Sequence, residues 1–147
     1  MSREEILAAI PHRPPFLLID RVVERSANRI RCSKTFDEGD YFFAGHYPEF
    51  PIVPGVLLCE AAMQAGAVLL AGEVDAEGKI PVATRIGDVR FKRMVRPGET
   101  IEIDVELTER MAGAFFLKAK VAVGAAVAAR LEFACTLAPL PAENSDR

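Results

Sequence analysis

The sequence predicts an α+β fold in which one antiparallel sheet wraps around one long, buried helix. The helix is indicated by the run from Gly55 to Ala71, which is apolar on nearly every side, and a helix of that kind has to be buried. The sheet is indicated by consecutive strand-like segments joined by tight turns at 80–95, 99–110, 114–123 and 126–137. Such strands form an antiparallel sheet, which has to cover the helix that cannot face water.

The chain before the long helix predicts one short helix and two further strands. An S-x-x-E capping box and the prolines that follow it indicate a helix over 3–9. Segments 16–24 and 29–36 are rich in aliphatic or alternating residues and read as strands. Residues 37–54 form a loop with many aromatic side chains, which is unusual unless they pack on a helix or surround a ligand.

Pro54 and Gly55 open the long helix, and Gly72 is its expected C-cap. Residues 73–79 then read as a polar turn. The sequence contains no internal repeat or linker, so we expect a single domain over 1–147 with a loose tail at 138–147. One sheet around one helix is the hotdog arrangement, and it leaves a sheet edge that needs a partner, so we expect a dimer.

Composition excludes several classes of protein. A net charge of −3 and a pI near 5.5 argue against nucleic-acid binding, because such domains tend to be basic. No secretory signal pattern is present, and the apolar stretch at 56–71 is short for a membrane span and contains Glu60. We therefore expect a cytoplasmic protein without a membrane span. The three cysteines lack metal-binding spacing, so no metal site is predicted.

The candidate chemistry lies in two ionisable residues close to the start of the long helix. Glu60 lies inside the apolar helix with Gln64 one turn further on the same face. A buried carboxyl is costly unless it is paired, protonated or functional. His46 lies just upstream in a loop, so the two form a candidate acid–base pair. Read separately, each could equally be a structural residue.

Four motifs carry a family resemblance: HRPPFLLIDRV at 12–22, FFAGHYP at 42–48, PGVLLCEAAMQ at 54–64 and FKRMVRPGE at 91–99. Together they resemble the β-hydroxyacyl-acyl carrier protein dehydratases of the FabZ type over roughly residues 10–137. Dehydratase–isomerases of the FabA type are similar, but they have Asp on the helix and Cys after the glycine. This chain has Glu60 and Val56 at those positions, which favours plain dehydration.

The resemblance implies a hotdog fold and a homodimer, often stacked as a trimer of dimers. It implies an active site at the dimer interface, with His46 from one subunit and Glu60 from the other, and often a cis peptide bond between His46 and Tyr47. The implied substrate is a 3-hydroxyacyl chain linked through phosphopantetheine to an acyl carrier protein. No cofactor is required.

Dehydration removes a proton from C2 and hydroxide from C3. His46 suits the base, and Glu60, whose pKa we expect burial to raise, suits the proton donor. The free N–H groups of Gly55 and Val56 at the helix start can stabilise the thioester oxygen. Gln64 either orients the carboxyl or is a buried amide bound by backbone.

A fatty chain requires an apolar tunnel beside the helix. The candidate tunnel residues, which an ordinary apolar core would also explain, are Phe42, Phe43, Phe50 and Val82. The carrier protein is acidic, and a basic patch could steer it, although a solvated strand face would have the same composition. The candidate docking residues are Arg90, Lys92, Arg93 and Arg96.

Two other functions stay open at the level of sequence. A hotdog acyl thioesterase would use Glu60 to activate water and would not need His46. In a non-catalytic acyl-binding subunit, the pair would be structural. The sequence is equally compatible with general fatty-acid synthesis, lipid A supply and a polyketide route.

Overall fold

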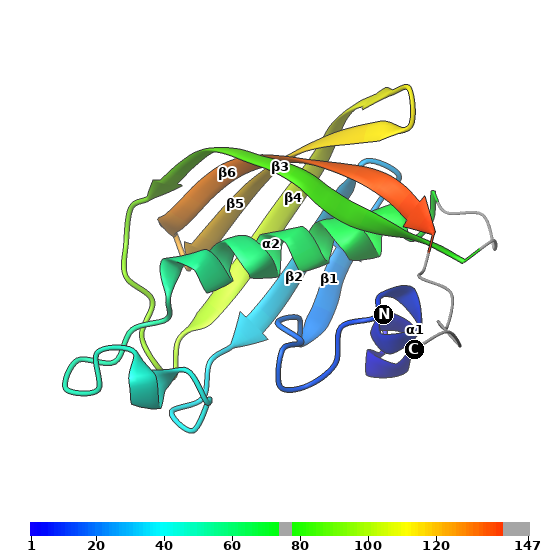
Figure 1. Cartoon of the computed structure of the whole chain (residues 1–147). Coiled ribbons are helices and arrows are strands. Elements are labelled where there is room, and N and C mark those ends of the chain that lie inside the picture. The colour runs from blue at the N-terminus through cyan, green and yellow to red at the C-terminus, as the bar shows by residue number, and fades with distance from the viewer. Residues whose placement is uncertain (74–77, 140–147) are drawn as a thin grey trace, which may run out of the picture.

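The computed structural model describes residues 1–73 and 78–139. Six antiparallel strands form one sheet in the order β1-β2-β4-β5-β6-β3. Helix α2 lies across the concave face of this sheet (Figure 1), which confirms the predicted fold class. The elements are α1 (Arg3–Ala9), β1 (Arg21–Arg25), β2 (Arg29–Thr35), the 3-10 helix η1 (Phe43–Gly45), α2 (Gly55–Leu70), β3 (Lys79–Phe91), β4 (Thr100–Met111), β5 (Ala114–Val123) and β6 (Ala126–Pro139).

Helix α2 is buried along most of its length, as its composition predicts. Its C-terminal half packs on the inner face of the sheet so closely that a Cβ on Gly66 would lie 2.7 Å from the Phe133 ring. The N-terminal turn differs, because Val56 is 71% exposed. An exposed valine at the start of an otherwise buried helix leaves apolar surface open at this end of the molecule.

The first strand begins later than the sequence pattern indicates. Residues 16–20 are not part of β1, and the side chain of Gln64 binds two of their backbone groups. The Leu18 N–H donates to Gln64 Oε1 at 2.7 Å, and Gln64 Nε2 donates to the Phe16 carbonyl at 2.8 Å. Backbone groups that bind a helix side chain are not available to a neighbouring strand, and within this segment the Asp20 N–H donates to the Ser33 carbonyl of β2 at 2.8 Å.

Strand β3 ends at Phe91 and not at residue 95. The N–H groups of Lys92 and Arg93 both donate to the Ala128 carbonyl, and the Val95 carbonyl then accepts from the Val53 N–H at 2.7 Å. The chain therefore leaves the sheet to support the loop before α2. Within that loop, the short helix η1 was not predicted from the sequence.

The predicted capping box of α1 is confirmed, with Ser2 and Glu5 bonded reciprocally. The C-cap of α2 is Ala71, in a right-handed conformation, so Gly72 is not needed for a left-handed turn. A Cβ on Gly72 would instead lie 2.8 Å from the Arg25 guanidinium, which donates to the Leu69 carbonyl. Glycine here leaves room for a side chain that caps the helix.

The expected tail at 138–147 begins inside β6, which extends to Pro139, and 140–147 lie outside the described residues. The expected turn at 73–79 includes 74–77, which also lie outside them. In the part of the chain that is described, no helix has both the length and the apolar composition needed to cross a membrane.

Replacing Gln64 with leucine keeps the volume of the side chain but leaves the Leu18 N–H and the Phe16 carbonyl without partners. Each unpaired buried polar group costs about 1–3 kcal/mol, so for two such groups we expect the free energy of unfolding to fall by roughly 2–6 kcal/mol. Urea unfolding followed by circular dichroism measures the change. Met63→Leu on the same helix is the matched control, and a loss no larger than in this control would contradict the assigned role.

Candidate active site

His46 follows η1, and its imidazole orientation is set by a backbone carbonyl. Its Nδ1 lies 3.0 Å from the Ile52 carbonyl oxygen, which can only accept a hydrogen bond. The proton therefore sits on Nδ1, and Nε2 keeps a free lone pair. This is the tautomer that a general base needs.

The residue after His46 has an unusual backbone conformation. Tyr47 adopts a φ of 51°, and its ring meets the His46 ring edge-on with centroids 4.8 Å apart. Non-glycine residues rarely adopt this region, and such strain concentrates at functional sites. The expected cis bond between His46 and Tyr47 is absent, and the cis peptide bond recorded among the described residues joins Pro14 and Pro15.

The start of α2 presents unpaired backbone donors. Pro54 is the N-cap and provides no side-chain cap, and within the described residues neither Gly55 nor Val56 donates its N–H to another backbone group. These donors lie at the positive end of the helix dipole. A Cβ on Gly55 would lie 2.8 Å from the Phe91 ring, so only glycine lets that ring pack here.

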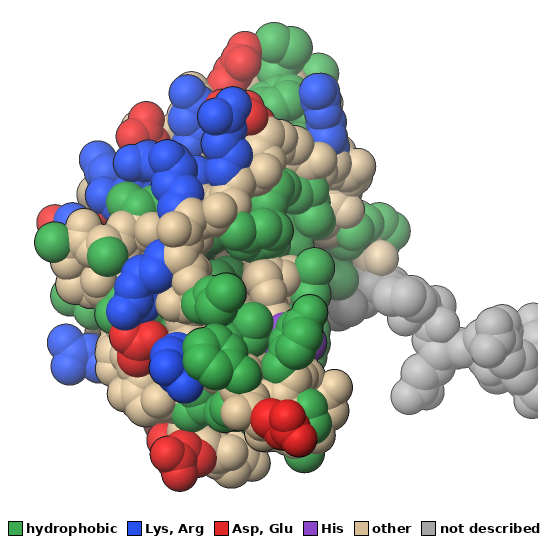
Figure 2. Space-filling model, turned by 90° about the vertical axis from the view of Figure 1, so that its left-hand side faces the viewer, with side chains coloured by type: hydrophobic (Ala, Val, Ile, Leu, Met, Phe, Trp, Pro, Cys, Tyr) green, Lys and Arg blue, Asp and Glu red, His purple; other side chains and the backbone are tan. Residues whose placement is uncertain are grey.

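A cavity of about 620 Å³ adjoins His46 and the first turn of α2. Much of its wall is apolar and includes Val53, Leu58 and Met94, while Lys92 and Arg93 also border it. In Figure 2, which faces this end of the molecule, hydrophobic side chains gather in the middle and Lys and Arg side chains gather beside them. The cavity can hold an apolar chain with an anionic group at its entrance.

Glu60 lies one turn further along α2 and is anchored through a single oxygen. Its side chain is 23% exposed, and Gln64 Nε2 donates to its Oε2 at 2.9 Å. Gln64 is 0% exposed and holds the backbone of residues 16–18 at the same time. Gln64 therefore contacts the Glu60 carboxyl and the backbone of residues 16–18 at the same time.

Sequence reasoning missed one residue at this site. His12 Nε2 lies 3.7 Å from Glu60 Oε2, although 48 positions separate the two residues in the chain. Burial lowers the pKa of His12 below its ordinary value of 6.5, the charge of Arg13 acts in the same direction and Glu60 opposes both. The sequence feature that could have indicated His12 is its position at the start of the HRPPF motif.

His46 and Glu60 make no direct contact within the described part of one chain. Glu60 is not among the residues that line the cavity beside His46. No hydrogen bond or ion pair joins the two side chains within the described part of the chain. Within the described residues, the two members of the predicted acid–base pair therefore have different neighbours and make no direct contact.

The predicted tunnel residues do not line this cavity in a single chain. Phe43 is buried in the core, and Phe42 packs edge-on against Phe36 and Tyr41. Phe50 is exposed beneath Arg96, whose guanidinium carbon lies 4.4 Å from the ring centroid, and Val82 is exposed on β3.

Only Arg90 of the four predicted docking residues lies in a strand, because β3 ends at Phe91. Arg90 lies 3.5 Å from Asp88, and Arg93 makes two hydrogen bonds to Glu99. Lys92 is exposed and forms no ion pair with any residue that the structure describes.

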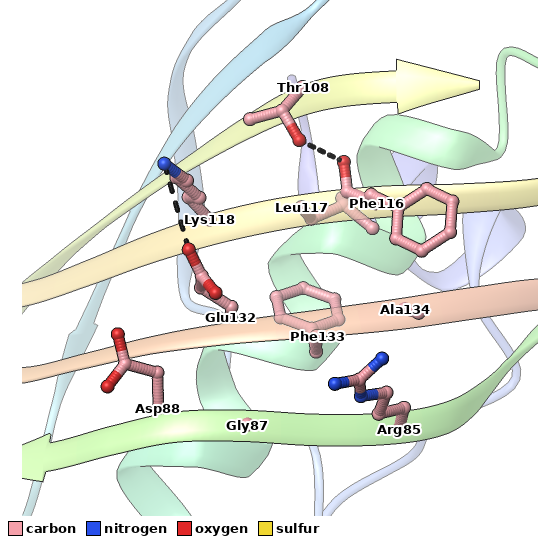
Figure 3. A pocket seen from close by; sticks show the side chains of 10 residues that line it. All are labelled: Arg85, Gly87, Asp88, Thr108, Phe116, Leu117, Lys118, Glu132, Phe133 and Ala134. Atoms are coloured by element: carbon pink, nitrogen blue, oxygen red, sulfur yellow. Dashed lines mark hydrogen bonds and ion pairs between the residues drawn. The ribbon is translucent and has the colours of Figure 1, made fainter. Parts of the chain in front are cut away.

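A second hollow of about 290 Å³ lies over β3, β5 and β6 (Figure 3). It contains neither His46 nor Glu60. Several of its polar groups bind each other, with Lys118 lying 3.6 Å from Glu132 and Thr108 donating to the Phe116 carbonyl. The described residues also contain no group of three or more His, Cys, Asp or Glu side chains placed to hold a metal ion.

Solved structures with similar folds define the class of protein first. The chain matches a dehydratase heterocomplex from Xenorhabdus doucetiae with a TM-score of 0.74 and 16% identity, over 94% of this chain and 91% of that one. It matches a mutant thioesterase from Pseudomonas aeruginosa with a TM-score of 0.72 and 14% identity, over 93% and 94%. The chain therefore has the hotdog fold, which serves more than one activity.

Sequence comparison then identifies the family. Residues 10–132 match the FabA-like domain family. A 3-hydroxyacyl-[acyl-carrier-protein] dehydratase FabZ from Petrotoga mobilis is 41% identical over 90% of this chain and 94% of its own length. The FabZ protein of Caulobacter vibrioides is 44% identical over 88% and 84%. The chain belongs to this dehydratase family, as the motifs indicated.

The lowered pKa of His12 predicts a pH dependence of stability. Because the folded-state pKa lies below 6.5, the unfolded chain binds more protons as the pH falls through that value. The contribution of His12 is therefore fully present above pH 6.5 and is lost as the pH falls toward the folded-state pKa. The free energy of unfolding of wild type, relative to that of His12→Gln, should therefore fall as the pH is lowered from 8 to 5. A constant difference between them would contradict this assignment.

Proposed function

We propose that the protein removes water from a 3-hydroxyacyl chain carried on an acyl carrier protein, producing the trans-2-enoyl thioester. The observation that carries the proposal is that His46, whose Nδ1 is bonded to the Ile52 carbonyl, lines one apolar cavity together with Gly55 and Val56, whose N–H groups are free. The names of the curated relatives support the same reaction.

In the proposed mechanism, His46 Nε2 takes the proton from C2 and the electron pair moves toward the thioester carbonyl. The N–H groups of Gly55 and Val56 stabilise the negative charge that develops on that oxygen. Glu60 gives its proton to the C3 hydroxyl, which leaves as water when the double bond forms. His46 ends protonated and Glu60 ionised, and proton exchange with solvent restores both.

We propose that two chains form the site, because within one chain no described contact joins His46 to Glu60 and Glu60 does not line the cavity beside His46. Strand β3 lies at the edge of the sheet and exposes a set of large apolar side chains, Val82, Ile86, Val89 and Phe91. A long apolar edge of this kind favours pairing with a second copy. We therefore infer a homodimer in which His46 of one subunit and Glu60 of the other form the site. We also propose that three such dimers can assemble into a hexamer.

The acidic carrier protein is proposed to dock beside the cavity entrance. Lys92 is the strongest of the four candidate residues, because it is exposed, borders the cavity and is not neutralised by a described carboxylate. Arg90 forms an ion pair with Asp88, and Arg93 forms one with Glu99, so their charges are partly neutralised. Phe42, Phe43, Phe50 and Val82 stay candidates for the acyl tunnel of the assembled dimer.

Substituting either member of the acid–base pair should abolish water elimination. Loss of a positioned general base or acid typically lowers the rate by about 10²- to 10⁴-fold, so we expect losses of that size in His46→Ala and Glu60→Gln. The assay is hydration of a crotonyl thioester and dehydration of its 3-hydroxybutyryl counterpart. Release of free thiol by the wild type would point to the thioesterase instead.

Mixing the two variants tests whether the site is shared between chains. A dimer of His46→Ala with Glu60→Gln contains one intact site if the pair is formed across the interface, so co-refolded protein should recover about one quarter of the wild-type rate. A pair formed within one chain gives no recovery. Size-exclusion chromatography of each variant checks that the assembly is retained.

Charge reversal at Lys92 should weaken only the carrier-linked reaction. Loss of one exposed interfacial charge contact corresponds to about 1 kcal/mol, so KM for the acyl carrier protein substrate should rise roughly 5-fold in Lys92→Glu. Turnover of the pantetheine thioester should not change. Lys79→Glu, at the other end of β3, is the control, and equal effects of the two substitutions would argue against docking at Lys92.

A further inference from the structure

We propose that His12 is a positioning residue for the reaction, which in its neutral form directs an Nε2–H toward Glu60 Oε2 and leaves Oε1 to carry the transferred proton. This inference rests on the proposed role of Glu60 as proton donor. His12 and Glu60 come from different elements, the turn after α1 and the second turn of α2. Their facing atoms are 3.7 Å apart.

The backbone of His12 is held rigidly for this purpose. The Arg13 guanidinium donates to three carbonyls, those of Leu7, Ile10 and His12, each at 2.8 Å. Two of these acceptors lie at the end of α1. Arg13 therefore fixes the turn against the helix, and the imidazole projects from an ordered backbone.

The surroundings of the imidazole select one tautomer. His12 Nδ1 is buried and has no hydrogen-bond partner among the described residues. A proton on Nδ1 would be a buried donor without an acceptor, which is costly. Nε2 faces a carboxylate oxygen, so a proton there has an acceptor within a small movement. The neutral ring accordingly carries its proton on Nε2, the opposite assignment from His46.

The same surroundings keep the ring neutral. A second proton could only bind at the buried, unpartnered Nδ1. The charged groups that act on His12 are Glu60 of α2 and Arg13 of its own turn, and burial together with Arg13 outweighs the carboxyl. Neutrality suits a proton donor, because an imidazolium beside Glu60 would hold the carboxyl ionised. A neutral ring orients the carboxyl without that effect.

The two oxygens of Glu60 thereby receive different roles. Oε2 accepts from Gln64 Nε2 at 2.9 Å and faces His12 Nε2 on its other side. Oε1 has no hydrogen-bond partner in the described part of the chain. The anchored oxygen fixes the plane of the carboxyl, and the free oxygen is the one that can present a proton to a substrate hydroxyl.

Three substitutions separate this role from a merely structural one. Gln places an amide nitrogen near the position of Nε2, so His12→Gln should retain most of kcat, whereas His12→Leu should lower kcat roughly 10-fold or more with little change in KM. His12→Lys places a permanent positive charge beside Glu60 and should lower kcat further than leucine does. Equal kcat values in the glutamine and leucine variants, or wild-type kcat in the lysine variant, would overturn the proposal.

A measurement without substrate tests the tautomer directly. Nitrogen-15 chemical shifts of the His12 ring at pH 8 should report a protonated Nε2 and an unprotonated Nδ1, and the reverse pattern would overturn the proposal. The Glu60→Gln variant separates the proposed donor role of Glu60 from the proposed positioning role of His12. If it retains wild-type turnover, the proposed donor role of Glu60 fails. If Glu60→Gln is inactive while His12→Leu turns over as wild type, only the role of His12 fails.

Discussion

The amide of Gln64 is the polar contact on which the arrangement of the site depends. It is fully buried on an apolar helix, yet every one of its hydrogen bonds is made to a specific group, the Leu18 N–H, the Phe16 carbonyl and Glu60 Oε2. A buried amide is tolerated only when its partners are all present. This requirement fixes the extended segment before β1 against α2, and it places the turn that carries His12 over the carboxyl.

The two proposed catalytic side chains come from neighbouring segments, His46 from the loop before α2 and Glu60 from the second turn of α2. The loop before α2 sets the tautomer of His46 through the Ile52 carbonyl, and the helix start supplies unpaired N–H donors beside an apolar cavity. The second turn of the helix carries Glu60 on a face that one chain leaves partly open. A second copy that covered this face would shield the carboxyl from water and supply the missing imidazole, and both changes would favour proton transfer.

The hotdog fold does not select the reaction. Structures of similar shape include a dehydratase and a thioesterase at 14–16% identity, so the sheet and its central helix are a support for different sites. In the proposed mechanism, dehydration depends on the pairing of a histidine loop with a helix carboxyl. The two histidines of this chain are assigned opposite tautomers, because Nδ1 of His46 has a hydrogen-bond partner and Nδ1 of His12 has none among the described residues.

The sequence by itself determined the features that depend on local pattern. Apolar residues on every side of the run from Gly55 predict a buried helix, the capping box predicts α1, and the spacing of turns predicts an antiparallel sheet; all are present. Tertiary structure decided where β1 begins and which groups meet Glu60. The apolar pattern that begins at Phe16 predicts a strand, but the Leu18 N–H and the Phe16 carbonyl bind Gln64, which lies 46 and 48 residues away. No periodicity encodes a contact of that length, because it arises only when the turn after α1 packs on α2. For the same physical reason, the place of His12 beside the carboxyl was visible only in three dimensions.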